Sequence, residues 1–333
     1  MKRAAILCPG RGSYTEKTLG SLPLDHPWVR RADERRRARG LASLATLDRA
    51  QKFEAATHLS PVNASGLIWL VSMLDAAAAA SEHEIVCVAG NSMGWYTALA
   101  AAGALSFDDG FRLVQEMAIL QEKQQKAEGG GQVLYPLVDD RWKTDAKLET
   151  AVRVGLAESK GEARLSIRLG GYAVLAGTEA GIAHLLRALP KVKLGQNLYP
   201  FRLMQHGAYH TPIVASVAES ARELLADLEF RAPTTTLVDG RGARFTPWST
   251  DPAELADYTL GVQITETFDF TASVRVALRE HAPDLLVCPG PGNTLGGVCG
   301  QILAEEGWRG IRSREDFDRV QQSGEPILVS MRR

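Results

Sequence analysis

The turn at Gly90–Gly94 has the residue types and spacing of a nucleophilic serine site. Its sequence is Gly-Asn-Ser-Met-Gly, and it lies between the apolar run Ile85–Ala89 and the alanine-rich run Trp95–Ala102. Glycines on both sides of the serine allow a strained strand-to-helix turn that exposes the hydroxyl, as in the GxSxG nucleophile elbow. The next N–H then lies at a helix N-terminus, where it can stabilise an oxyanion. The pattern predicts Ser92 as a nucleophile.

A serine nucleophile needs a base, and the chain has seven histidines. His210 lies in the segment Gly-Ala-Tyr-His-Thr-Pro, directly before an expected helix at 211–228. At the end of an element an imidazole can reach a reacting group more easily than from a buried helix face. His206 is a rival on pattern alone. We therefore expect His210 to be the base, with His206 as the alternative.

Buried strands that alternate with helices are expected around this turn. The expected strands include Ala4–Cys8 and Leu285–Cys288, and the expected helices include Asn63–Ala80 and Phe107–Lys126. This alternation is typical of an α/β fold. After the Gly129–Gly131 break the pattern becomes β-α-β-β-α, with a fourth strand near Leu198–Leu203. That order predicts an inserted ferredoxin-like unit.

Composition excludes several classes of protein. In 333 residues the apolar share of 45 % and the charged share of 23 % exclude bulk disorder. A net charge of -1 provides no basic field for nucleic acid. The four cysteines have neither metal-site nor disulfide spacing. The N-terminal apolar run is too short for a signal peptide, and Gly66–Ala80, which Asp75 interrupts, is shorter than a membrane span. We expect a cytoplasmic protein that binds no nucleic acid, membrane or metal.

Four motifs occur in an order that resembles one enzyme family. Pro9–Ser13 resembles the motif PGQGS, Gly90–Gly94 resembles GHSLG, Gly207–His210 resembles an xAFH-type histidine motif, and Gly290–Gly292 resembles a late GPG turn. Gln263 resembles a further glutamine of the family. Over nearly the whole chain the sequence resembles the malonyl-CoA:acyl-carrier-protein transacylases and the acyltransferase domains of polyketide synthases.

The resemblance implies an architecture. We expect a discontinuous α/β-hydrolase-like catalytic domain at residues 1–126 and 199–333. A ferredoxin-like subdomain at residues 127–198 is inserted into it, and the active site lies in the cleft between the two parts.

The resemblance also implies a ping-pong acyl transfer. Ser92 attacks an acyl-CoA thioester, His210 takes the proton, and the acyl group then passes to the phosphopantetheine thiol of an acyl carrier protein. Acyl-CoA and the carrier are substrates, and no cofactor is permanently bound. The two oxyanion N–H groups of the family carry over to Arg11 and Met93. A main-chain carbonyl orients the family's histidine, and by position it belongs to Glu266.

The sequence departs from the family in the predicted acyl pocket. Met117 stands where malonyl-type members have an arginine that binds the carboxylate of the substrate. Asn91 and Trp95 replace the usual residues around the elbow, and Asn63 replaces a glutamine. The predicted substrate-binding residues are Arg11, Asn63, Asn91, Trp95, Met117 and Tyr209.

A thioether cannot pair with a carboxylate, so Met117 predicts a small, uncharged, acetyl-like acyl group. Tyr209, a bulky residue beside His210, argues against α-branched acyl groups. Arg11 leaves an alternative open, because it could bind a malonyl carboxylate from the other side of the pocket. It could instead pair with a pocket acid or contact the phosphates of CoA.

Two other functions stay open. The same elbow would serve an editing hydrolase that removes acyl groups from acyl carrier proteins. A pseudo-enzyme used for docking is the third possibility, although Ser92 and His210 argue against it. The basic segment Arg30–Arg39 is either a solvated mixed-charge helix or a surface that attracts an acidic carrier protein.

Overall fold

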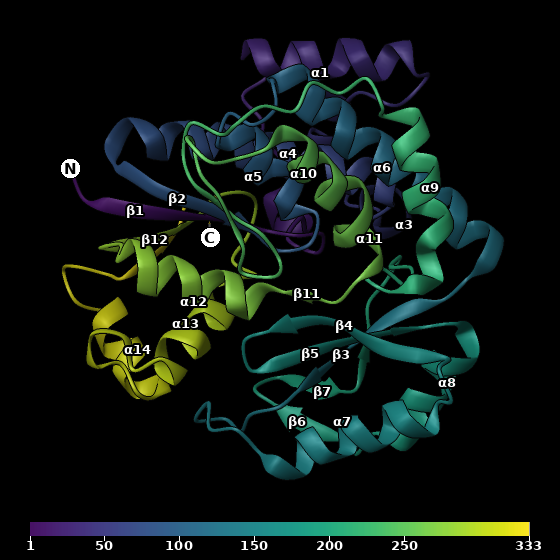
Figure 1. Ribbon diagram of the computed structural model, residues 1–333, viewed down its shortest axis with the longest axis vertical. Helices are drawn as coiled ribbons and strands as arrows, with labels where there is room; N and C mark the ends of the chain where they lie inside the picture. The colour runs from purple at the N-terminus through teal and green to yellow at the C-terminus, as the bar shows by residue number, and fades with distance from the viewer. Residues whose placement is uncertain (333) are drawn as a thin grey trace.

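Two main β-sheets organise the computed structural model, which describes residues 1–332 (Figure 1). The larger sheet has the strand order β10-β9-β2-β1-β12-β13, and every neighbouring pair is parallel except β10 and β9. Its strands are β1 (Arg3–Cys8), β2 (Glu84–Gly90), β9 (Leu237–Val238), β10 (Arg244–Phe245), β12 (Leu285–Cys288) and β13 (Leu328–Ser330). This parallel sheet, with helices between its strands, confirms the predicted α/β class.

Helices cover both faces of the larger sheet (Figure 1). One face carries α4 (Pro61–Glu82), α5 (Gly94–Ala101) and α6 (Phe107–Glu128), and the other carries α12 (Phe270–His281) and α13 (Gly296–Glu305). Burial on both faces explains why β1 and β2 are nearly continuous apolar runs rather than alternating ones.

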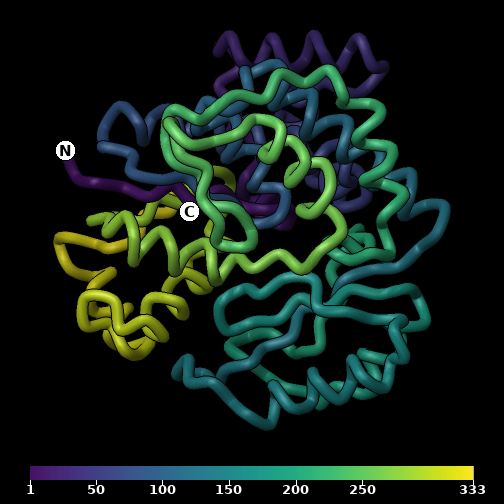
Figure 2. The backbone as a smooth tube through the Cα atoms, viewed as in Figure 1, coloured from purple at the N-terminus to yellow at the C-terminus, as the bar shows by residue number. Residues whose placement is uncertain are grey.

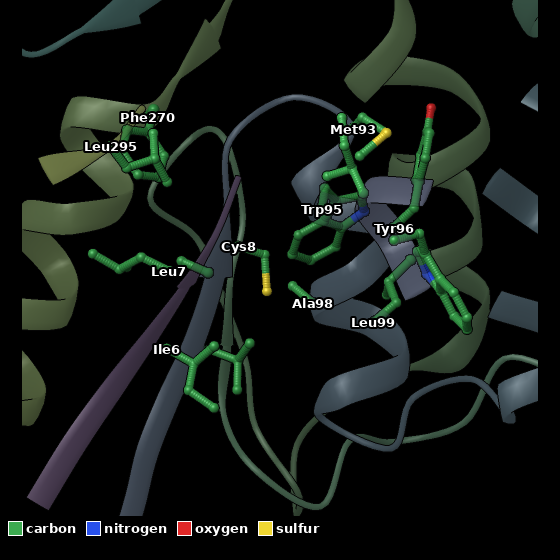
Figure 3. Close-up of a cluster of buried hydrophobic side chains, with 14 of the residues drawn as sticks. Ile6, Leu7, Cys8, Met93, Trp95, Tyr96, Ala98, Leu99, Phe270 and Leu295 are labelled. Atoms are coloured by element: carbon green, nitrogen blue, oxygen red, sulfur yellow. The ribbon is translucent and has the colours of Figure 1, made fainter. Parts of the chain in front are cut away.

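The core between these layers follows the two-residue period of the central strand. Figure 3 shows Leu7 on the side of Phe270 and Leu295, while Cys8 lies on the side of α5 near Trp95 and Ala98. All six of these side chains are buried. Because successive strand residues point to opposite faces, β1 packs against both helix layers. The loop that follows β1 is therefore held in place by both layers.

The helix α4 is long and apolar enough to cross a membrane by length and composition. However, 72 % of its most apolar window is buried inside the protein. It packs against α5 and α6. Its buried Asp75 is paired with Arg332 at 2.8 Å near the end of the chain. In this fold α4 is therefore the central helix of the core.

The smaller sheet has the strand order β11-β4-β5-β3-β8. Its elements are β3 (Gly131–Pro136), α7 (Ala146–Glu158), β4 (Ala163–Leu169), β5 (Tyr172–Gly177), α8 (Glu179–Ala188) and β8 (Phe201–Arg202). Their chain order is β-α-β-β-α-β, as the sequence predicted for a ferredoxin-like unit. The fifth strand, β11 (Phe268–Asp269), comes from the large part of the chain and pairs in parallel with β4.

The sheets differ from the predicted boundaries in two places. The strand β8 of the smaller sheet lies beyond the expected boundary at 198, and β11 adds a strand from residues assigned to the catalytic domain. Figure 2 shows the chain passing from the large part to the small part after α6 and returning after β8. These two crossings place the small sheet opposite the nucleophile.

Further helices and strands lie outside these two main sheets and their covering helices. They are α1 (Pro27–Ala38), α2 (Leu44–Asp48), α3 (Ala55–His58), β6 (Val192–Leu194), β7 (Asn197–Tyr199), α9 (Ala215–Leu224), α10 (Pro252–Asp257), α11 (Gln263–Thr265) and α14 (Arg314–Gln321). The expected helix at 211–228 is shorter, because a 3-10 turn at Pro212–Val214 precedes α9.

The basic segment Arg30–Arg39 lies mostly in α1, on the far side of the large part from the small sheet (Figure 1). Arg31 and Arg35 both pair with Asp108, and Arg39 pairs with Glu116 at 2.7 Å. The structure therefore favours a surface helix whose arginines are partly held by α6, and this helix is remote from the cleft.

Candidate active site

Ser92 lies on a strained turn between β2 and α5. Its φ of 55° is in the left-handed region, which residues with a side chain seldom adopt. A Cβ at Gly90 would lie 2.1 Å from the carbonyl oxygen of Gly94, and a Cβ at Gly94 would lie 2.2 Å from that of Cys8. No side chain fits at either position. The tight packing explains both glycines of the predicted elbow.

The imidazole of His210 reaches the serine hydroxyl. Its Nε2 is 2.7 Å from Ser92 Oγ, and its Nδ1 is 2.7 Å from the carbonyl oxygen of Gln263. Because that carbonyl can only accept, Nδ1 carries the proton and Nε2 is free to accept one from the serine. The rival His206 instead has its Nδ1 2.8 Å from the carbonyl oxygen of Met204. Of the two predicted bases, the structure brings His210 to the nucleophile.

The residue that orients His210 corrects the sequence prediction. The carbonyl belongs to Gln263 and not to Glu266, which ends the short helix α11 in an extended conformation. A π-helical turn at Tyr258–Val262 precedes Gln263. Such turns change which residues of a helix face a site, and they are frequent at functional sites. The sequence carries no signal for this turn, so position alone selects the wrong carbonyl.

Gln263 also holds the nucleophile turn through its side chain. Its Nε2 donates to the carbonyl oxygen of Ser92 at 3.1 Å, and its Oε1 accepts from the hydroxyl of Tyr96 at 2.9 Å. One residue thus ties the histidine to the serine turn and to α5. The sequence singled out Gln263 by resemblance but assigned it no role.

Burial lowers the pKa of His210 to about 4 from its ordinary value of 6.5, and the nearby positive charge of Arg11 acts in the same direction. The carbonyl of Gln263 acts against both. The imidazole is therefore neutral at physiological pH and can accept a proton from Ser92.

We expect the acylation of Ser92 to depend on pH through this group. A pKa of about 4 means that the rate is constant near neutrality and falls as the pH drops through about 4, because imidazolium cannot accept the proton. Rapid-quench mass spectrometry of acyl-enzyme formation from about pH 3 to about pH 8 measures this. Circular dichroism over the same range controls for unfolding. An inflection near 6.5, the ordinary value, would contradict the depressed pKa.

A cavity of about 560 Å³ opens over Ser92 and His210, between the large part and the small sheet. Of the other predicted site residues, Arg11, Asn91, Met93 and Tyr209 line it. The small sheet contributes an apolar wall that includes Leu134, Ile167, Leu169 and Val174. The cleft between the two parts is thus where the sequence placed the site.

Three predicted substrate-binding residues do not line the cavity. Trp95 is fully buried, donates from Nε1 to Thr259 Oγ1 at 3.0 Å, and packs edge-on against Tyr258. Asn63 accepts from Arg36 Nη2 at 2.6 Å and donates to the carbonyl oxygen of Thr57. Both side chains stabilise contacts between elements, which corrects their assignment to the acyl pocket.

Met117 is the third predicted substrate-binding residue that does not line the cavity, which corrects its assignment to the acyl pocket. It is 1 % exposed and belongs to the hydrophobic core of the large part. The residue of α6 that lines the cavity is Gln121, one helical turn further on. Counting from the nucleophile identifies the correct helix, but the rotation of that helix decides which side chain reaches the cavity. The sequence has no signal that distinguishes Gln121 from its neighbours.

The guanidinium of Arg11 has no carboxylate partner among residues 1–332. Its Nη1 donates to the carbonyl oxygen of Gln205 at 3.3 Å, and its Cζ lies 4.8 Å from the ring centre of Tyr209. Its Nη2 is buried and unpartnered within the described chain. The predicted alternative in which Arg11 pairs with a pocket acid is therefore absent from the structure, and the charge is available to a ligand.

No family model matches the sequence. The malonyl CoA-acyl carrier protein transacylase of Salmonella typhimurium is 26 % identical over 323 residues, covering 91 % of this chain and 94 % of the relative.

Two solved structures share the fold. The acyltransferase domain from the second module of the salinomycin polyketide synthase has a TM-score of 0.74 at 21 % identity, covering 100 % of this chain and 69 % of that chain. A malonyl-transacylase in complex with a type II polyketide synthase acyl carrier protein has a TM-score of 0.74 at 19 % identity, covering 99 % and 96 %. Over nearly its whole length the chain is therefore similar in sequence to malonyl CoA-acyl carrier protein transacylases, and it has the fold of such a transacylase and of a polyketide synthase acyltransferase domain.

Proposed function

We propose that the protein is a serine acyltransferase that moves an acyl group from acyl-CoA to the phosphopantetheine thiol of an acyl carrier protein. The observation that carries the proposal is the contact of 2.7 Å between Ser92 Oγ and His210 Nε2, two residues that line the cavity. An imidazole held in this tautomer activates a serine hydroxyl, which is otherwise a weak nucleophile.

The chemistry runs in two half-reactions. Ser92 Oγ attacks the thioester carbonyl while its proton moves to His210 Nε2, and the tetrahedral intermediate expels the CoA thiolate, which takes that proton. The acyl group is then an ester of Ser92. In the second half-reaction the thiol of the carrier gives its proton to His210 and attacks the ester. Ser92 Oγ leaves and takes the proton back, so no cofactor is consumed.

The backbone N–H groups of Arg11 and Met93 are the proposed oxyanion donors. Both residues line the cavity beside Ser92. Neither N–H donates to another acceptor within residues 1–332. A Cβ at Gly10 would lie 2.8 Å from the carbonyl oxygen of Asn91, so the Arg11 loop packs directly on the elbow. Backbone donors held this rigidly stabilise a developing negative charge without reorganising.

For the acyl group, the structure supports a carboxylated, malonyl-like substrate bound by Arg11. A cavity arginine with a buried, unpartnered Nη2 favours an anionic ligand, and guanidinium matches carboxylate geometry. The acetyl-like group that Met117 predicts is the second candidate. It is favoured by the contacts of Arg11 with Gln205 and Tyr209, which already use part of the guanidinium.

Mass spectrometry of the intact protein tests the function. We expect incubation with acyl-CoA to add one acyl group to Ser92, and holo acyl carrier protein to remove it with formation of acyl-carrier. Ser92→Ala is expected to give no adduct. Loss of the adduct to water at the same rate with and without carrier would indicate the editing hydrolase instead. No adduct in the wild type would exclude acyl transfer. The cytoplasmic location stays a prediction.

A further inference from the structure

Three exposed apolar side chains, which we call the apolar stripe, lie close together in the chain, in β7, in β8 and in the turn after β8. Leu198 is 62 % exposed, Phe201 is 49 % exposed and Met204 is 59 % exposed. Within residues 1–332 seven large hydrophobic side chains are 40 % exposed or more, and three of them fall in this run of seven residues. Single exposed hydrophobics are ordinary on soluble proteins, but a group of them marks an interaction surface.

This stripe belongs to a segment of chain that lines the cavity. We call residues 191–204 the rim segment. Its residues Leu194, Asn197, Tyr199 and Leu203 line the cavity that leads to Ser92, whereas the three stripe residues do not. The stripe side chains therefore face outward along the cavity wall. Gly195, Gln196 and Asn197 are exposed and also line the cavity, so the cavity reaches the surface along this segment, and a partner that places a group on Ser92 from this side lies beside the stripe.

The rim segment is also free of negative charge. Residues 180–218 contain neither Asp nor Glu. Lys191 and Lys193 are exposed, and neither forms an ion pair with another residue of the described chain. Arg202 is already paired with Glu179 at 2.6 Å. The exposed Asp140 lies against this segment, where its Oδ1 accepts from the N–H of Gly195 at 3.2 Å. The segment itself combines apolar side chains with the unpaired positive charges of Lys191 and Lys193, which suits an acidic partner that has apolar patches of its own.

We propose that the rim segment is the docking surface for the acyl carrier protein, and this rests on the proposed function above. The carrier is a folded protein, and a cavity of about 560 Å³ admits only its prosthetic arm, so its body must rest on the rim. Acyl-CoA is small and polyanionic and does not need three apolar side chains outside the cavity. A second copy of this chain on the same surface would cover the entrance.

The apolar part of the surface is tested with the triple variant Leu198→Ser, Phe201→Ser and Met204→Ser. We expect the kcat/KM for transfer to the holo form of a bacterial type II acyl carrier protein to fall by about tenfold or more. Acylation of Ser92 by acyl-CoA and transfer to free pantetheine are expected to stay within about twofold, because neither involves the carrier's body. Trp248→Ser, at an 83 % exposed side chain that does not line the cavity, is the matched control.

The charged part is tested by reversing Lys191 and Lys193 to Glu. We expect weaker carrier binding in fluorescence anisotropy, a lower kcat/KM for the carrier and a reduced dependence of both on ionic strength. The control reverses Arg30 and Arg37, which are exposed on α1 away from the cavity. We expect this control to transfer like the wild type.

Three outcomes would overturn the docking surface. Carrier kinetics and binding that match the wild type in both rim variants would exclude it. An equal loss with free pantetheine would mean that the stripe only shapes the cavity. A wild-type dimer that the triple variant dissociates, measured by light scattering, would assign the stripe to a second copy of the chain. Failure of the proposed function is distinguished from failure of the docking surface, because it would appear as no modification of Ser92 by acyl-CoA. In that case the anisotropy measurement still decides whether the rim segment binds the carrier.

Discussion

Replacing His210 by alanine is expected to slow the acylation of Ser92 by about 10²- to 10⁴-fold, the usual contribution of a positioned general base. The imidazole lies 2.7 Å from the hydroxyl and is held by the carbonyl of Gln263, so its loss removes the proton acceptor and leaves the serine in place. Rapid-quench mass spectrometry of the acyl-enzyme measures the rate, and Ser92→Ala sets the background.

His206→Ala is the matched control for this prediction. His206 also lines the cavity, and burial lowers its pKa to about 3, but it is bonded to the carbonyl of Met204 rather than to the serine. We expect this variant to acylate within a few-fold of the wild type. The assignment of the base is wrong if the His206 variant loses most of the activity while the His210 variant keeps it.

Arg11→Gln is expected to reduce loading of malonyl groups by a factor of hundreds to thousands. A buried carboxylate that loses its arginine costs about 3–5 kcal/mol, and about 1.4 kcal/mol corresponds to a tenfold change in kcat/KM. Loading of acetyl groups is expected to change little, because glutamine keeps the backbone N–H at position 11. The measurement compares kcat/KM for malonyl-CoA and acetyl-CoA in the wild type and the variant.

Met117→Arg tests whether the side chain at position 117 reaches the cavity. Met117 lies in the core and not on the cavity wall, so we expect an arginine there to lower the melting temperature without raising malonyl loading. Preferred loading of acetyl groups in the wild type, with no effect of Arg11→Gln on the malonyl rate, would instead support the uncharged substrate. A gain of malonyl loading in Met117→Arg would show that the side chain at 117 reaches the cavity.

The sequence was sufficient for features that depend on local backbone geometry. The motif of Ser92 and its flanking glycines can be recognised from the sequence, because the strained turn leaves no space for a Cβ at either glycine. The inserted β-α-β-β-α-β unit can be predicted from the sequence, because strands and helices differ in the period of their hydrophobic residues. The preference for His210 over His206 came from its place at an element end, and the structure brings that residue to the serine.

Side-chain orientation on long helices depended on tertiary packing. Met117 and Gln121 are both on α6, and only the rotation of that helix against its neighbours puts Gln121 in the cavity and Met117 in the core. Trp95 directly follows the elbow in sequence, yet it turns toward Thr259 and Tyr258. Proximity in sequence to a nucleophile does not place a side chain in its pocket.

The sequence by itself determined the strained turn that carries Ser92, the class of fold and the order of its parts, because these follow from steric limits and hydrophobic periods within short stretches of chain. Only the tertiary structure decided which carbonyl orients His210, which helix residue reaches the cavity and which arginine remains unpaired there. Those features depend on the π-helical turn before Gln263 and on packing between segments far apart in the chain. Such contacts form only when the two parts fold together over Ser92.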